Sequence, residues 1–438
     1  MIEIASIGVI IIILLLSYNK NNLSLLFPII LLIYPNAVDN LLPGVYLNYS
    51  NISNSEPYQI LRFIDFILLF IAFRVGSTFK IRQVSISLFL LFYICFLITP
   101  YLFGFHKYLF SLFIVLIFIC RIFLINIIVK KLYNNSAKLK KMFIGLALGT
   151  GLIVLESIIY TIINGSSTLQ SGNYANNTLG AILAILLTIL VFARLGKYLP
   201  RQYILIISLS FIFLLLTGAR VAILTFSIVL LTGYFNKTKL LTFLLKGIPI
   251  ITGVVLISIM VYSLNPTISN KFNISKGINI QSIDDIALDE WGNYGNVSSL
   301  IYRFRLWYAT IQMSLDNIYF GTGMNSWDFV RWEYDILEPY RLDTHNSYLL
   351  LISEFGIPIG LLIIILFFNT IYVCRKFDSP YRYIYWGLIV LSITQLTNAS
   401  ILRLNFLMVT ILLLMIISRD NIVMTINQND KKINKRKK

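Results

Sequence analysis

Long runs of isoleucine, leucine and phenylalanine recur along this chain from residue 7 to residue 417. A bilayer crossing needs about 20 apolar residues, or fewer where the span is short or tilted. The chain is 58% hydrophobic and only 13% charged, whereas about a quarter of a soluble domain is charged. These features exclude an ordinary soluble domain and predict an all-α polytopic membrane protein with about 12–13 transmembrane helices. The thirteen candidate spans are 4–18, 23–38, 58–74, 84–100, 108–129, 142–163, 179–194, 202–217, 221–235, 247–263, 347–374, 383–398 and 404–418.

The connections between these spans alternate in charge. Lysine and arginine gather at residue 20 and in 74–82, 130–141, 194–201, 237–246, 375–382 and 419–438. By the positive-inside rule, these connections face the cytoplasm and the intervening ones face outward. The first two spans are joined by only residues 18–22, so they could instead form one re-entrant hairpin.

This alternation divides the chain into four parts. We expect about ten spans in 1–263, a periplasmic loop with interfacial helices in 264–345, about three spans in 346–418 and a basic cytoplasmic tail in 419–438. The excess of 36 basic over 19 acidic residues therefore reflects topology, and we expect no nucleic-acid partner. A nucleic-acid or anionic-lipid patch is the alternative interpretation of the tail.

The outer loop 264–345 is too long for a simple connection. It carries six basic and ten acidic residues. In its second half Tyr302, Leu306, Ala309 and Met313 recur at helical spacing. Four of the five tryptophans also lie in this loop. We expect helices on the outer membrane surface that roof a cavity.

Metal and cofactor signatures are weak. The three cysteines lie far apart and there are only two histidines, so the sequence predicts neither a zinc site nor a disulfide framework. No acidic triplet suggests a catalytic metal, and we expect no cofactor. Gly321 and Gly323 lack the context of a nucleotide site, so we interpret them as a turn that lets the loop pack closely.

Several charges fall at bilayer depth, where inserting each one costs at least about 2.5 kcal/mol. Each of these residues therefore needs a partner or has a function. Arg62 and Asp65 could form a plain ion pair on one helix. Arg121 could reach the cytoplasmic interface, which is the simplest interpretation. Glu156 needs a cation from another helix, and Arg121 or Arg220 could supply it.

Arginines also mark the outward side. Arg220 follows a very short joint between two spans, Arg303 and Arg305 begin the amphipathic stretch, and Arg403 lies at an outward turn. Guanidinium groups bind phosphate through two parallel hydrogen bonds and stay charged at physiological pH. Interfacial anchoring could explain one or two of them, whereas a cluster indicates an anionic ligand.

The motifs around these arginines are specific. They read R-x-x-x-W at 303–307, F-G-T-G at 320–323, H-N-x-x-L at 345–349 and E-x-G-x-x-x-G at 354–360, after T-G-A-R at 217–220. Over 217–360 this pattern resembles the O-antigen ligase and polymerase superfamily of bacterial envelope polysaccharide assembly. One departure is Ala219, where that superfamily more often has serine.

The resemblance implies a multi-span glycosyltransferase of the C-superfamily type in the bacterial inner membrane, with its active site facing the periplasm. Its donor would be an oligosaccharide linked to undecaprenyl pyrophosphate. Arg220 and Arg303 would bind the pyrophosphate, and His345 would orient or deprotonate the acceptor hydroxyl. Arg305, Arg403, Asn346, Glu354 and Trp307 are the further candidate substrate-binding residues.

Two roles are open to alternatives. His345 could instead cap the following helix, and Glu354 could hold an arginine in place or act in catalysis. The residue chemistry fits a metal-independent transfer, because guanidinium groups can stabilise a leaving pyrophosphate.

Two reactions share this scaffold. A polymerase transfers the chain to the nonreducing end of another lipid-linked repeat unit, and a ligase transfers it to lipid A-core. The Asn/Ile/Lys-rich composition and the divergent N-terminal half are typical of a gene from a variable polysaccharide cluster, which favours the polymerase. A chain-length regulator is a candidate partner. A lipid-linked oligosaccharide flippase is the alternative from another class, but its polar groups would lie at the bilayer midplane rather than beside one outer loop.

Overall fold

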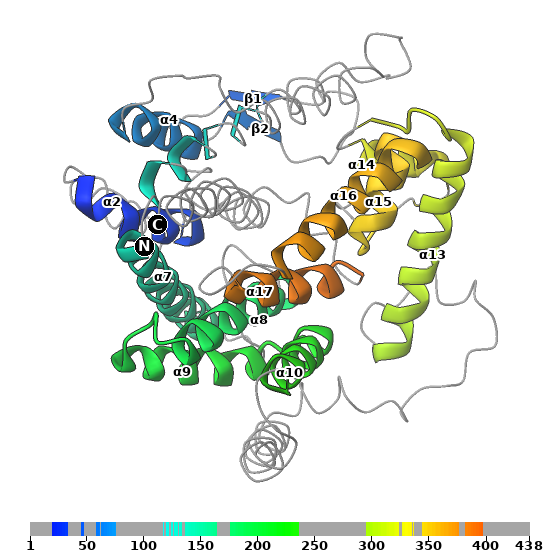
Figure 1. Cartoon of the computed structure of the whole chain (residues 1–438). Helices are drawn as coiled ribbons and strands as arrows, with labels where there is room; N and C mark the ends of the chain where they lie inside the picture. Colours follow the sequence, from blue (N-terminus) through cyan, green and yellow to red (C-terminus); the bar gives the residue numbers. More distant parts are fainter. Residues whose placement is uncertain are drawn as a thin grey trace, which may run out of the picture.

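Figure 1 shows the computed structural model of the chain. The described residues are 20–33, 45–47, 58–61, 63–75, eleven separate positions between 117 and 133, 136–163, 176–235, 295–323, 326–334, 336, 344–375 and 382–396. Predicted spans 4–18, 84–100, 247–263 and 404–418 lie outside these residues, as do Arg403 and the basic tail.

The described part is helical apart from one pair of short strands. The antiparallel strands are β1 (Val45–Leu47) and β2 (Tyr58–Leu61). The α-helices are α2 (Lys20–Ile33), α4 (Phe63–Val75), α7 (Ser136–Ile163), α8 (Asn176–Leu195), α9 (Ile204–Leu216), α10 (Arg220–Phe235), α13 (Gly295–Asp316), α14 (Trp327–Val330), α15 (Ser347–Phe355), α16 (Ile357–Arg375) and α17 (Arg382–Thr394). Two 3₁₀ turns, η1 (Arg201–Tyr203) and η3 (Arg331–Tyr334), complete the described helical elements.

Two of these helices are long and apolar enough to cross a membrane, at Ala137–Ile163 and Asn177–Leu195. Five shorter apolar helices overlap further predicted spans: Asn22–Leu32, Arg201–Leu216, Arg220–Gly233, Ile357–Asn369 and Tyr383–Thr394. The helical nature of these segments is therefore confirmed.

The predicted span 347–374 is wrong as one continuous helix. It is broken into α15 and α16 at Gly356, which has a φ of 79° and ends α15. Glycine adopts this left-handed conformation without the steric cost that other residues pay. Pro358 follows in the first turn of α16, where its missing N–H is tolerated.

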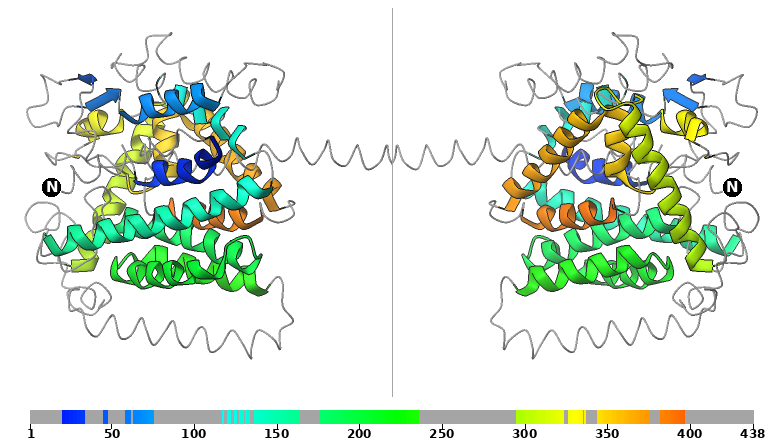
Figure 2. Two further views of the ribbon diagram at one scale, coloured as in Figure 1. Left: turned by 90° about the vertical axis from the view of Figure 1, so that its left-hand side faces the viewer. Right: turned by 90° about the vertical axis from the view of Figure 1, so that its right-hand side faces the viewer.

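The main core surrounds α8, which packs against α7, α9, α10 and α17. Its side chains are buried along most of its length, and Phe192 stacks on Trp386 of α17 with ring centroids 5.4 Å apart. In Figure 2, α7, α9 and α10 lie in adjacent layers while α13 runs steeply to them. Helix α16 packs against α17 of this bundle and against α15, so it connects the bundle to α15.

A smaller core joins α13, α14 and α15. It contains Leu306, Ala309, Met313, Trp327, Val330, Ile336 and Leu350. The predicted helical pattern is confirmed for its members in α13, which form one buried face of that helix. The Tyr302 side chain lies outside the described residues.

Arg121 does not reach the interface, so the snorkelling interpretation is wrong. Its side chain is 5% exposed and forms a two-pronged ion pair with Asp65, with Nη2 donating to Oδ2 at 2.7 Å. Burial makes a carboxylate partner necessary, and Asp65 supplies it from 56 residues away. Arg62, the neighbour expected to pair with Asp65, lies outside the described residues.

Candidate active site

The segment before α15 is a rigid turn closed by side chains. Asn346 is the N-cap, and its Oδ1 accepts hydrogen bonds from the backbone N–H of Tyr348 at 3.0 Å and of Leu349 at 3.2 Å. The Thr344 hydroxyl donates to the Asn346 carbonyl at 2.7 Å and accepts from its N–H at 3.1 Å. Asn346 therefore performs the capping that was the alternative role of His345.

His345 lies inside this turn in a left-handed conformation, with a φ of 50°. Histidine tolerates this region better than most residues, yet such a position costs on the order of 1–3 kcal/mol and persists only where its surroundings fix it. Thr344 and Asn346 supply those constraints on either side. The half-buried imidazole is thus carried on a fixed and locally strained backbone.

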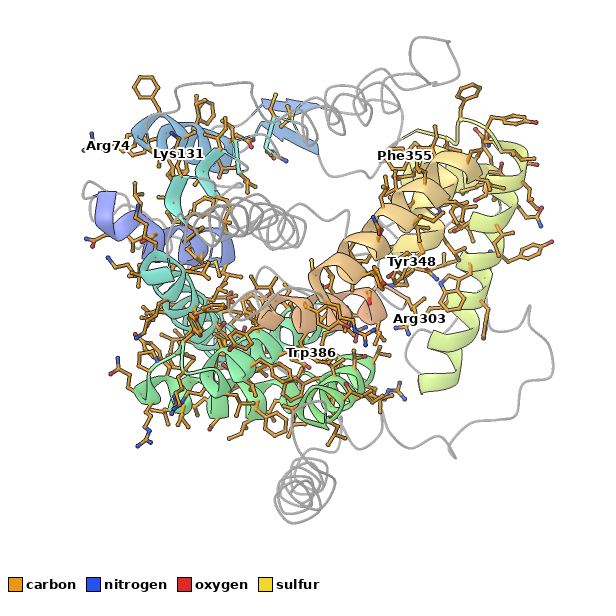
Figure 3. All side chains as sticks on the ribbon, viewed as in Figure 1. Arg74, Lys131, Arg303, Tyr348, Phe355 and Trp386 are labelled. Atoms are coloured by element: carbon orange, nitrogen blue, oxygen red, sulfur yellow. The ribbon has the colours of Figure 1, made fainter. Side chains whose placement is uncertain are left out.

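Helix α13 is attached directly to the same turn. The Trp307 indole Nε1 donates to the Thr344 carbonyl at 2.9 Å. Trp307 follows Arg303 by one helical turn, so both lie on the same edge of α13. Figure 3 shows Arg303 on the side of α13 that faces α15, where Tyr348 is labelled. The structure therefore brings Arg303, Trp307, His345 and Asn346 to one junction of α13 and α15.

Helix α17 holds this junction from the other side. Ser347 donates its N–H to the Gln395 carbonyl at 3.0 Å and its hydroxyl to Gln395 Oε1 at 2.6 Å. The Tyr348 hydroxyl donates to the Ser392 carbonyl at 2.7 Å. Gln395 is fully buried, and sequence reasoning missed it because it lies 48 residues from its partner in a segment without a motif.

The T-G-A-R joint before Arg220 is as short as the sequence predicts. Thr217 closes it by donating to the Leu214 carbonyl at 2.7 Å and accepting from the Ala219 N–H at 3.2 Å. Gly218 has a φ of 64°, which favours glycine. Gly180 of α8 lies so close that a Cβ there would be 2.3 Å from that of Ala219, so α8 leaves little space at this joint.

Arg220 is the first residue of α10 and its side chain is exposed. Helix α10 packs on α17, and α17 in turn holds Ser347 at the start of α15. Arg220 and His345 thus lie on elements that are joined through α17. That Arg220 and Arg303 share one ligand remains a prediction.

Arg305 points away from this junction. At about 100° per residue, it lies about 200° around α13 from Arg303. It is half-buried at the opposite edge of the helix. A common role for Arg303 and Arg305 on one phosphate group is therefore not supported by the helix geometry.

The F-G-T-G segment packs its backbone against the end of α15. Thr322 N–H donates to the Ser353 carbonyl at 2.9 Å, and Gly323 N–H donates to the Glu354 carbonyl at 2.8 Å. Gly321 has a φ of 68°, and a Cβ there would lie 2.4 Å from the Glu354 carbonyl carbon. The interpretation of these glycines as a close-packing turn is confirmed.

Glu354 is 2% exposed and lies at the opposite end of α15 from His345. Its Oε1 accepts from the backbone N–H of Trp327 at 3.4 Å. The Trp327 indole donates to the Thr310 hydroxyl at 3.0 Å, and that hydroxyl donates to the Leu306 carbonyl at 2.6 Å. This buried polar bridge, Glu354–Trp327–Thr310, connects α15 through α14 to α13.

Arg331 is a buried arginine of the segment after α14 that sequence reasoning missed. It is 2% exposed, its Nη1 donates to the Ile336 carbonyl at 2.9 Å, and its Cζ lies 4.6 Å from the centroid of Trp332. The adjacent Arg-Trp pair was the available signal. Nearby, the Tyr334 hydroxyl donates to Asp316 Oδ2 at 2.8 Å, and burial, followed by this carboxylate, raises the pKa of Tyr334 above its ordinary value.

Within the residues described, no three histidine, cysteine or acidic side chains gather closely enough to hold a metal ion. The groups at the α13–α15 junction are instead a cation, an imidazole, an indole and a carboxamide. Such a set can bind an anionic group and accept a proton from a nearby hydroxyl.

One protein family is similar to the part of the chain that carries these elements. Residues 204–364 match the family described as O-antigen ligase, a range that includes the short joint before Arg220 and the whole α13–α15 junction. A search of curated proteins gave no match.

Proposed function

We propose that this chain, whose residues 204–364 match the O-antigen ligase family, is a membrane glycosyltransferase that polymerises O-antigen. It transfers glycan from undecaprenyl pyrophosphate to the nonreducing end of another lipid-linked repeat unit. The reaction takes place at the periplasmic face of the inner membrane.

The observation that carries this proposal is the α13–α15 junction. Trp307 ties the helix edge that bears Arg303 to the turn that bears His345. A transfer from a lipid pyrophosphate needs cationic charge at the leaving group and a proton acceptor at the attacking hydroxyl. The junction provides one of each on rigid elements.

In the proposed reaction the acceptor hydroxyl oxygen attacks the anomeric carbon of the donor sugar. A new glycosidic bond forms, the bond from that carbon to the pyrophosphate oxygen breaks, and the hydroxyl proton passes to His345. Undecaprenyl pyrophosphate leaves with the bonding electrons, and Arg303 and Arg220 stabilise its charge. Guanidinium groups would serve here in place of a divalent metal.

The remaining residues have supporting roles in this proposal. Asn346 fixes the histidine turn, Trp307 fixes α13 to it, and Glu354 positions α15 through Trp327. Arg403 is a weaker candidate for contact with the donor, and Arg305, on the opposite edge of α13 from Arg303, is the weakest. The other proposed partners are the bilayer and a chain-length regulator protein.

The lipopolysaccharide of a deletion strain, separated on a gel, tests the proposal. A polymerase deletion should leave a single repeat unit on the core. Bare core with accumulated lipid-linked polymer would identify a ligase and contradict the polymerase assignment. Bare core without any periplasmic lipid-linked repeat would indicate a flippase and contradict the glycosyltransferase assignment as well.

A further inference from the structure

Helix α13 has a second apolar face, which the other described elements leave exposed. Phe304, Tyr308, Ile311 and Leu315 follow one another at helical spacing, and Ile318 and Tyr319 continue the stripe in the next turn. Their side chains are between 41% and 72% exposed. This exposed stripe lies on the other side of α13 from the buried residues Leu306, Ala309 and Met313.

Such a stripe is unusual for a helix surrounded by water. Contiguous exposed apolar patches of this kind mark contact with a membrane, a partner or a ligand. Helix α13 is not among the described helices that are apolar enough to cross a bilayer. A helix with one apolar face, too polar to span, is suited to lie in the membrane interface.

The charges on α13 indicate which surface covers the stripe. Arg303 and Arg305 lie about 200° apart and border the stripe on its two sides. The helix contains one acidic residue, Asp316, which accepts a hydrogen bond from Tyr334 and lies outside the stripe. Cations that border an apolar face match the phosphates above an acyl-chain surface, and the tyrosines suit the same depth.

We propose that the exposed stripe of α13 docks onto the outer-leaflet surface of the bilayer, with the two arginines at the depth of the lipid phosphates. This inference rests on the proposed function for its orientation, because the outer face of the membrane holds the lipid-linked donor. Docking would place Arg303, and with it the α13–α15 junction, at the level of the donor's diphosphate. The stripe would thus set the height of the site above the membrane.

Spin-label accessibility tests this docking in the full chain. Cys95, Cys120 and Cys374 are replaced by serine, and a single cysteine is then introduced by Ile311→Cys or Leu315→Cys. The labelled protein is reconstituted in vesicles of phosphatidylethanolamine and phosphatidylglycerol. Relaxation by oxygen, which partitions into lipid, is compared with relaxation by a water-soluble nickel chelate.

Glu333→Cys serves as the matched control, because Glu333 is an exposed, charged residue of η3 that is not part of the stripe. Docking predicts an oxygen-to-nickel ratio several times higher at 311 and 315 than at 333. Equal ratios would place the stripe in water and overturn the proposal. Low relaxation by both reagents would mean that protein covers the stripe, which also overturns it.

The measurement uses no substrate, so its failure is distinguishable from failure of the proposed function. A lipid-docked stripe in a chain that makes no polymer would refute only the reaction. A water-exposed stripe in an active polymerase would refute only the docking.

Discussion

The contact between the F-G-T-G turn and α15 allows a quantitative prediction for Gly321→Ala. A Cβ at this position would lie 2.4 Å from both the Glu354 carbonyl carbon and the Gly356 nitrogen. Both are backbone atoms, so no side-chain rotation relieves the clash. The left-handed φ of 68° adds about 1–2 kcal/mol for a residue other than glycine.

Overpacking of this kind typically costs a further 1–3 kcal/mol or so. We therefore expect Gly321→Ala to lower the free energy of unfolding by about 2–5 kcal/mol, or to displace the turn from α15 with a similar loss. Because that turn also carries the hydrogen bonds to Ser353 and Glu354, polymer synthesis should fall with it.

Gly151→Ala is the matched control. It lies inside α7, where an added Cβ would be 3.6 Å from its nearest neighbour, Ile206, in ordinary contact. Alanine should stabilise that helix by about 0.5–1 kcal/mol. Thermal unfolding of the purified proteins, followed by intrinsic fluorescence, compares the two variants. Equal melting temperatures for Gly321→Ala and wild type would refute the argument from backbone contact.

Three further substitutions test separate contacts. Asn346→Ala removes the α15 cap and should lower the free energy of unfolding by about 0.5–2 kcal/mol, as measured by thermal unfolding. It should also reduce the polymer yield more than Asn346→Asp, which keeps a capping oxygen; equal yields would show that the cap does not serve the site. Trp327→Phe loses the hydrogen bond to Thr310 and also part of the buried ring, so the bond itself is measured in a double-mutant cycle with Thr310→Val. The coupling energy between the two substitutions should be about 0.5–1.5 kcal/mol, and a coupling energy of zero would contradict the bond. Asp65→Ala leaves the Arg121 guanidinium buried without this carboxylate and should lower the free energy of unfolding by about 3–5 kcal/mol. An added Arg121→Met should restore most of that stability. An Asp65→Ala protein as stable as wild type would contradict the buried pair.

Local patterns predicted most of the described helices. Apolar runs fix where a helix forms, and the spacing of Leu306, Ala309 and Met313 correctly predicted the buried face of α13. The short joint before Arg220 was also predictable, because almost no residues separate the apolar runs 202–217 and 221–235. The break in the span 347–374 was missed, because the residues on both sides of Gly356 are apolar and their hydrophobic pattern does not show where α15 ends.

Contacts between distant segments could not be predicted in the same way. The Arg121–Asp65 pair and the Ser347–Gln395 bonds join residues 56 and 48 positions apart. One sequence shows that a buried charge needs a partner, but many carboxylates satisfy that need equally well. Only the packing of the helices selects among them.

The candidate site was predicted in part. The motif residues Trp307 and His345 lie at one junction, whereas Arg305 faces the other edge of α13. Trp327, one of the four tryptophans in 264–345, bridges Glu354 and Thr310 inside the small core, which its position in the sequence does not predict. Residue types suggest chemistry, but the helix angle and the tertiary bonds decide which groups meet.

The α13–α15 junction is the proposed site of glycan transfer. It is tested most directly by polymer synthesis from purified, radiolabelled lipid-linked repeat units with Arg303→Ala and His345→Ala, beside the control Arg201→Ala, an exposed arginine of η1. For His345→Ala we predict a rate lower by a factor of about 10²–10⁴, as expected for the loss of general acid–base catalysis, and a comparable loss for Arg303→Ala. All three variants should insert normally into the membrane, and Arg201→Ala should keep full activity. Near-normal turnover by either junction variant would contradict the account.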